Sequence, residues 1–204
     1  MAWKDITPKT FASIRELKGI SARTQEEHYE LYKGYVGKVN EIQKKLDAVD
    51  RTTANQIFSD LRALRIDYSF AIGGMKNHEI FFGHLGGKGG APSGKLKEQI
   101  ARDFPSYDAW LADFKASGLA ARGWVWLAYD HDLSMLTTVL GDAQNTFPLW
   151  NATPILALDV YEHAYWLDYG RARAKYIDAF FNNLDWNVVA ANLDRALSMQ
   201  PAAK

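Results

Sequence analysis

Cysteine is absent from this chain of 204 residues. Disulfides, thiolate metal ligands and cysteine nucleophiles are therefore excluded. An excess of one charge is also absent, because 24 lysines and arginines balance 24 aspartates and glutamates. This balance argues against nucleic-acid or membrane-surface partners. No apolar run approaches the roughly 20 residues of a membrane span, and the first residues lack the layout of a signal peptide. We expect a cytoplasmic protein with no nucleic-acid and no membrane partner.

Aromatic residues, by contrast, are plentiful, with 7 Trp, 10 Tyr and 10 Phe. A single chain of this length hides roughly 70% of its surface on folding. Aromatic side chains can fill such a core or line a dry site, and composition does not distinguish the two.

The residues up to about 86 show helical periodicity. Thr24 and Glu27 form a capping-box pattern, which predicts a helix with Thr24 as its N-cap. A stripe at spacings of three and four follows, made of His28, Tyr32, Tyr35, Val39 and Ile42. A second helix is predicted from about Ala54 to Leu85, ending where the glycines at 86–87 permit a left-handed exit. A short connection near residues 50–53 predicts an antiparallel hairpin.

Residues 86–94 contain five glycines and one proline, and we interpret them as a linker. After this stretch the residue pattern changes from helical periodicity to a mixture of helical and strand-like segments. Short strands are predicted at 122–129, 134–140 and 154–158, with helices at about 95–103, 107–116, from 161 and at 188–199. The sequence therefore predicts an α+β fold. A long antiparallel helical hairpin in 1–88 is followed by an α/β lobe in 89–204, which holds a small antiparallel sheet of about three strands.

The histidines are the candidates for chemistry, and there are five of them. His28 and His78 lie on apolar helix faces, and His163 follows Asp159 by four residues, so both side chains of that pair can point into one cavity. Imidazole and carboxylate together suit Mn, Fe or Zn. A histidine on an apolar face is more often a hydrogen-bonded core residue than a ligand. For His84 and His131 we expect solvated surface roles.

Several motifs resemble the iron/manganese superoxide dismutase family. The segment 159–165 (DVYEHAY) resembles the family signature DxWEHAY, and Asn77-His78 resembles the start of its NHxxxW segment. His28-Tyr29 with Tyr35-Val36 resembles its HYxxHHxxYV helix. The strand motif GWxWL is matched at 123–127, and a YxNxR motif followed by Tyr is matched at 169–176. These matches occur in the family's order along nearly the whole chain.

The resemblance implies a superoxide dismutase, which disproportionates superoxide to oxygen and hydrogen peroxide. One Mn or Fe ion per subunit would be held between the two halves, which contribute two ligands each. The implied ligands are His28, His78, Asp159 and His163. A fifth position would hold solvent.

Around the metal, the resemblance assigns further roles. Gln144 would hydrogen-bond the bound solvent, and Tyr35 would be the gateway tyrosine, with Tyr32 as a rival. Trp124 and Tyr161 would form part of an aromatic wall, and Arg173 would attract the anionic substrate. Glu162 would bridge to the partner's ligand histidine in a homodimer or homotetramer. In the family, a glutamine supplied by the loop and a small residue two before the aspartate ligand favour Mn. Here these would be Gln144 and Ala157, with Gly74 leaving room for Gln144.

This sequence departs from the family pattern in its first-helix motif, which is one residue shorter between His28 and Asn40 and lacks the paired histidines. Trp166 also replaces a tyrosine that normally contacts one of them. Two alternatives therefore stay open. One is a non-haem iron oxygenase with two histidines and a carboxylate, and the other is a non-catalytic metal-binding protein on the same fold.

Overall fold

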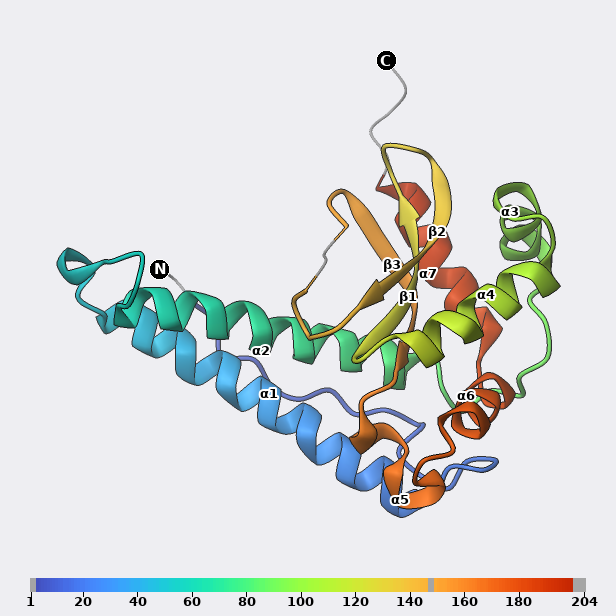
Figure 1. Ribbon diagram of the computed structural model, residues 1–204, viewed down its shortest axis with the longest axis horizontal. Helices are drawn as coiled ribbons and strands as arrows, with labels where there is room; N and C mark the ends of the chain where they lie inside the picture. Colours follow the sequence, from blue (N-terminus) through green and yellow to red (C-terminus); the bar gives the residue numbers. More distant parts are fainter. Residues whose placement is uncertain (1–2, 147–148, 200–204) are drawn as a thin grey trace.

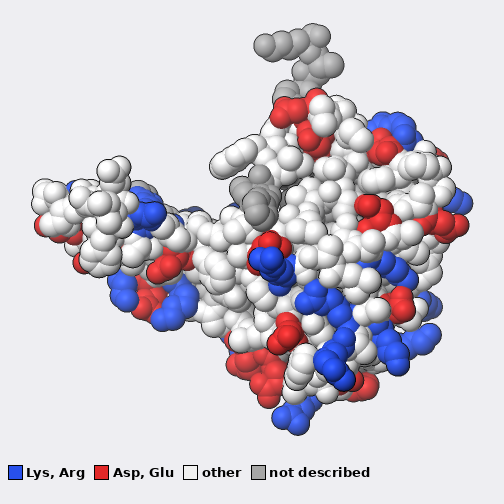
Figure 2. Space-filling model, in the orientation of Figure 1, with Lys and Arg blue, Asp and Glu red and all other residues white. Residues whose placement is uncertain are grey.

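The computed structural model describes residues 3–146 and 149–199. Two long helices come first, α1 (Ala22–Ala48) and α2 (Asp60–Gly83), and Figure 1 shows them packed side by side. A 3₁₀ turn, η1 (Arg51–Thr53), lies in the connection between them. The predicted antiparallel helical hairpin is confirmed. Its tip projects from the molecule beside a broad hollow (Figure 2) and exposes Ile57 and Phe58.

The helix starts differ from those predicted. The N-cap of α1 is Ser21, whose Oγ accepts a hydrogen bond from the Thr24 backbone N–H, so the predicted Thr24 cap is wrong. The second helix begins at Asp60, later than predicted, because Asn55 and Ser59 bind nearby backbone N–H groups instead. Such local side-chain hydrogen bonds compete with helix formation.

An α/β region follows, in which α3 (Gly94–Asp103) and α4 (Tyr107–Ala120) precede a three-stranded antiparallel sheet. Its order is β2 (Met135–Gly141), β1 (Trp124–Asp130), β3 (Ala152–Asp159), so β1 is central. The predicted sheet is confirmed. Helix α4 packs against β1 and β2, and α2 packs against β3. Antiparallel pairing sets Asp159, at the end of β3, opposite Trp124, at the start of β1.

The chain after the sheet is more broken than predicted. In place of one helix from residue 161 there are η2 (Glu162–Ala164), α5 (Trp166–Tyr169) and α6 (Arg173–Asn182). Gly170, which has a φ of 50°, separates α5 from α6. The last helix is α7 (Trp186–Ser198). Within the described residues, no helix is both long and apolar enough to cross a membrane.

The glycine-rich stretch at 86–94 is not a free linker. Helix α2 ends at Gly83, two residues before the predicted end, and Gly86 takes a left-handed conformation, with a φ of 93°, in the chain that follows. The backbone N–H groups of Gly86 and Gly87 both donate to Asn183 O at 2.9 Å. A Cβ on Gly87 would overlap Leu184 O, so glycine is needed for this close crossing. Residues 86–93 contain no helix or strand, as the linker interpretation predicts, but their first part packs against the connection between α6 and α7.

Side chains from other segments hydrogen-bond backbone groups at both edges of the sheet. On β2, the Leu136 N–H donates to Asp103 Oδ2 at 2.7 Å. On β3, the Ala157 N–H donates to His84 Nε2 at 3.1 Å, and Asn192 donates to Ile155 O at 3.0 Å. His84 is 0% exposed, so the prediction of a solvated role for it is wrong. His131 lies half-buried in the turn after β1, with Nε2 2.8 Å from Thr153 Oγ1.

Candidate metal centre

Four separate elements bring the candidate ligands together where the hairpin meets the sheet. His28 comes from α1 and His78 from α2, Asp159 is the last residue of β3, and His163 lies in η2. The Tyr176 hydroxyl donates to Asp159 O at 2.8 Å and so fixes the end of β3. The turn into η2 is held by Asp159 Oδ1, which accepts from the Tyr161 N–H at 2.9 Å. Residues far apart in sequence therefore share one buried point.

The three histidines converge on a single carboxylate oxygen. Asp159 Oδ2 lies 3.2 Å from His28 Nε2, 3.2 Å from His163 Nε2 and 3.5 Å from His78 Nε2. One ligand atom from each of the four residues lies within 4.8 Å of the other three. A metal bonded at roughly 2.0–2.2 Å to each of four ligand atoms fits that spacing. The side chains of His28, His78 and Asp159 are at most 1% exposed, and that of His163 is 26% exposed.

His78 carries the clearest sign of a missing partner. Its Nδ1 lies 2.6 Å from Gly74 O, so that nitrogen holds the proton and donates it. Its Nε2 is then an acceptor, buried and without a hydrogen-bond partner among the described residues. An unpaired buried acceptor costs roughly 1–3 kcal/mol. A cation beside Asp159 would satisfy this nitrogen, so the residues present fit a metal ion.

Electrostatics favour the metal-binding protonation state at three of the four residues, Asp159, His28 and His78, whereas at His163 the proton would have to be displaced by the metal. Burial alone would raise the pKa of Asp159, but charge and hydrogen bonds from His163 and His28 hold that pKa well below its usual range. Burial lowers the pKa of His28, and that of His78 to about 3. For His163 burial acts to lower the pKa, yet the Asp159 charge makes the net shift upward. An ionised carboxylate with neutral imidazoles is the form that binds a metal.

A hydrogen-bonded group of aromatic and amide side chains lies against His78. The ring centres of Trp124 and Tyr35 are 5.2 and 5.3 Å from that of His78. Gln144 joins the two, because its Oε1 accepts from Trp124 Nε1 at 2.9 Å and its Nε2 donates to the Tyr35 hydroxyl at 3.1 Å. Tyr161 stacks on His163 at 5.2 Å. The site is therefore walled by aromatic rings on the side facing the sheet.

Tyr35, and not its rival Tyr32, reaches this group. Seven residues are close to two full helical turns, so the shortened motif still presents His28 and Tyr35 on one face of α1. The Tyr32 hydroxyl instead donates to Glu79 Oε1 at 3.1 Å and accepts from the Lys9 N–H at 2.9 Å. Tyr32 thus ties the N-terminal segment to α2.

Two neighbouring glycines of α2 face this group. A Cβ on Gly74 would lie 2.7 Å from the ring of Tyr35, which accepts the Gln144 hydrogen bond, and a Cβ on Gly73 would overlap Gln144 O. The direct contact with Gln144 is therefore made by Gly73, one residue before the glycine that the sequence analysis named. The sequence did carry a signal, since two glycines inside a helix cost about 1 kcal/mol each relative to alanine and indicate a close approach.

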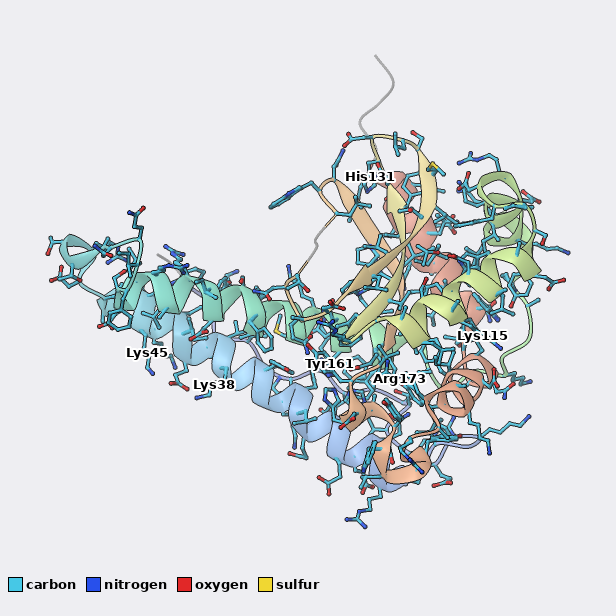
Figure 3. The ribbon with its side chains drawn as sticks, viewed as in Figure 1. Lys38, Lys45, Lys115, His131, Tyr161 and Arg173 are labelled. Carbon is cyan, nitrogen blue, oxygen red and sulfur yellow. The ribbon has the colours of Figure 1, made fainter. Side chains whose placement is uncertain are left out.

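A surface pocket of about 560 Å³ reaches the cluster from the side of His163. It is lined by Tyr161, Glu162, His163 and Arg173, and also by Arg122, which the sequence analysis did not single out. Figure 3 shows Tyr161 and Arg173 below the start of β1, with His131 at the opposite end of the sheet. The Arg173 guanidinium donates to Ala121 O at 2.8 Å and to the Tyr165 hydroxyl at 3.1 Å, so its position is fixed.

A buried centre of three histidines and one aspartate, set between a helical hairpin and a small sheet, defines a mononuclear metalloprotein. Comparison with known proteins gives the family. Residues 92–192 match the model for the C-terminal domain of iron/manganese superoxide dismutases. The chain belongs to this family.

The relatives extend the match beyond that domain. The chain is 42% identical to "Superoxide dismutase [Fe]" of Aquifex aeolicus, over 98% of this chain and 96% of the relative. It is 41% identical to the protein of the same name from Aquifex pyrophilus, with the same coverage. It is also 45% identical to "Superoxide dismutase [Mn] 2" of Halobacterium salinarum, over 60% of this chain and 62% of the relative. Both metals therefore occur among the names of similar proteins.

Proposed function

We propose that this protein is a superoxide dismutase that uses one Mn or Fe ion per subunit, held by His28, His78, Asp159 and His163. The observation that carries the ligand assignment is the convergence of three imidazole nitrogens on Asp159 Oδ2, with His78 Nε2 left unpaired. When bound, such an ion supplies one-electron chemistry: one superoxide is oxidised to oxygen, and a second is reduced and takes two protons to give hydrogen peroxide.

The chain's own residues would bind the ion, exclude water and hold protons. The Asp159 carboxylate offsets part of the metal charge, while Trp124 and Tyr161 keep bulk water from the ligands. Because the Tyr35 hydroxyl accepts from Gln144 Nε2, its own proton is free to point elsewhere. Burial raises the pKa of Tyr35, so the phenol keeps this proton through the neutral range and is able to donate a hydrogen bond towards substrate.

The nature of the substrate is supported by the pocket beside His163. Superoxide is a small anion, and Arg122 and Arg173 both line this pocket. With a net charge of zero over the chain, any attraction of an anion depends on local cations such as these.

Manganese is slightly favoured as the metal. This choice rests on the family resemblance, in which a glutamine supplied by the loop, here Gln144, and a small residue at Ala157 lean towards Mn. We expect higher specific activity with Mn than with Fe. Fe-loaded protein several-fold more active, with the Fe-to-Mn ratio unchanged in Gln144→Ala, would contradict the choice.

The chain is further proposed to form a homodimer or homotetramer through the surface around Glu162. Glu162 is exposed and adjoins the ligand His163 in the sequence. Three large apolar side chains close in sequence to the ligands are also exposed: Leu31 by 43%, Trp166 by 47% and Leu167 by 52%. Leu31 is on α1, and Trp166 and Leu167 are on α5. Both helices contact η2, and apolar side chains gathered in one patch mark interaction sites. Glu162→Ala should weaken the assembly and lower metal retention, as measured by sedimentation and metal analysis. If neither changes, Glu162 has no bridging role.

We also divide the chain into an N-terminal helical hairpin domain, 1–88, and a C-terminal α/β domain, 89–204. Each would then supply two of the four ligands. The third histidine favours this four-ligand site over the oxygenase alternative, which needs two histidines and one carboxylate.

The deciding experiment loads the full chain separately with Mn and Fe, measures metal content, and assays dismutation by the xanthine oxidase–cytochrome c method. We expect activity in step with metal content, and we expect Asp159→Ala and His163→Ala each to lose both. Bound metal without dismutation would support a non-catalytic metal protein. Activity retained in His163→Ala would support the oxygenase-type ligand set.

A further inference from the structure

The loop that follows β2 packs against one face of α2. Ser69, Gly73 and Asn77 are spaced by four residues and so lie in line on one helix face. Ser69 Oγ accepts from Asn145 Nδ2 at 2.6 Å. Asn77 Nδ2 lies 3.3 Å from Gln144 O and 3.4 Å from Gln144 Oε1. The loop is thus held at two points, and Gly73 lies between them.

Gly73 is where helix and loop make their closest approach. A Cβ built on Gly73 would overlap Gln144 O and lie 3.0 Å from Gln144 C, both of which are backbone atoms. By contrast, a Cβ on Gly34 or Gly37 of α1 would meet nothing within 4 Å. Any side chain at position 73 must therefore push the Gln144 backbone away from α2.

A retreat of that backbone would change contacts close to the proposed metal. The Gln144 amide forms hydrogen bonds with both Trp124 and Tyr35, and the rings of both residues pack against His78. The loop cannot follow freely, because the Thr146 hydroxyl accepts from the backbone N–H groups of Asp142 and Ala143 at 3.1 and 2.7 Å. Hydrogen-bond partners just beyond the ligands tune a metal's affinity and potential.

We propose that Gly73 is a positioning residue that sets how deeply the Gln144 amide reaches towards the metal centre. Because Gly73 has no side chain, the loop lies close against α2. The distance between the Gln144 backbone and α2 then determines the hydrogen bonds of Gln144 to Trp124 and Tyr35. This inference rests on the proposed function, but it assigns a role to a residue that touches neither metal nor substrate.

The test compares Gly73→Ala with the matched control Gly37→Ala, in Mn-loaded protein with metal content measured. Gly73→Ala should keep its metal and raise the reduction midpoint potential. With a weaker hydrogen bond from Gln144 Nε2, the Tyr35 hydroxyl becomes a weaker donor towards negative charge at the site, and that charge favours the oxidised ion. Gly37→Ala should match the wild type. A Gly73→Ala potential equal to the wild-type value at equal metal content would overturn the proposal.

Ser69→Ala provides a second variant if Gly73→Ala does not fold. It removes one anchor of the loop without adding any atoms, and it should shift the potential in the same direction by less. In that case, an unchanged potential would overturn the proposal.

A second readout does not depend on the metal. The Trp124 indole N–H resonance, assigned with Trp124→Phe in the metal-free chain, should move in Gly73→Ala and stay in place in Gly37→Ala. Wild-type protein that binds neither Mn nor Fe would refute the proposed function, whereas an unmoved Trp124 resonance would refute only the role of Gly73.

Discussion

His78 and His84 have nearly the same surroundings and entirely different partners. His78 lies in the last turns of α2 and His84 directly follows the helix, both are 0% exposed, and burial lowers the pKa of each to about 3. Phe81 packs near His84, and Phe82 packs near His78. However, His84 Nε2 accepts a backbone N–H from β3, whereas His78 Nε2 faces the Asp159 carboxylate. Each ring has one buried nitrogen without a hydrogen-bond partner among the described residues, Nδ1 in His84 and Nε2 in His78. Burial and an unpartnered nitrogen are therefore common to both, and the carboxylate that faces this nitrogen distinguishes the ligand.

The largest expected difference between these two histidines is in metal binding. His78→Ala should lower metal affinity by more than the roughly 10–100-fold that follows loss of a residue supporting a ligand. His84→Gln should keep the metal content of the wild type, because the amide oxygen can still accept from Ala157. Isothermal titration with Mn²⁺ and metal analysis measure both. Wild-type metal content in His78→Ala would remove the distinction.

Stability of the metal-free chain should show the reverse order. His84→Ala leaves the Ala157 N–H unpaired and opens a cavity, which should cost about 2–4 kcal/mol. His78→Ala should cost less, because no backbone N–H group loses its acceptor when this ring is removed. Urea unfolding in the presence of a chelator measures both values. A greater loss for His78→Ala would mean that His78 contributes to packing as much as His84 does.

The pH dependence of stability in the metal-free chain should show the contribution of the buried His84. The folded pKa of His84 is lowered to about 3 from 6.5, so the unfolded chain binds this proton more readily. Stability should therefore fall as the pH drops from 6.5 towards 3, by up to about 1.4 kcal/mol per pH unit for this group. His84→Gln should remove that part of the slope in metal-free protein, with urea midpoints measured between pH 6.5 and 4.5. Equal slopes would place the acid sensitivity elsewhere.

Two cationic side chains, Arg173 and Lys115, can be compared in the same way. Their effect on the dismutation rate is the smallest that we expect. Arg173 lines the pocket beside His163, whereas Lys115 on α4 is paired with Asp178 at 2.7 Å and lies away from that pocket (Figure 3). Arg173→Gln should lower the rate at limiting superoxide by about 2–10-fold and weaken its dependence on salt. Lys115→Gln should change neither. A silent Arg173→Gln would remove Arg173 from substrate delivery.

The histidine pair also shows how far sequence reasoning reaches. Helical periodicity and short branched strands predicted the hairpin and the sheet, because these patterns depend on local spacing. The family motifs brought His28, His78, Asp159 and His163 to attention, and the structure brings these four together. His84 was misjudged because its partner, Ala157, lies 73 positions away in the chain. Gly73 was missed for the same reason, since its significance comes from a loop beyond β2.

The covered edges of the sheet bear on self-association through strands. A three-stranded sheet has two outer strands, and their free backbone groups are templates for pairing with another chain. Here Asp103 occupies the Leu136 N–H, while His84 and Asn192 occupy Ala157 and Ile155. A fourth strand would have to displace these side chains before it could pair with the same backbone groups. Asp103, His84 and Asn192 therefore oppose edge-to-edge association at these positions.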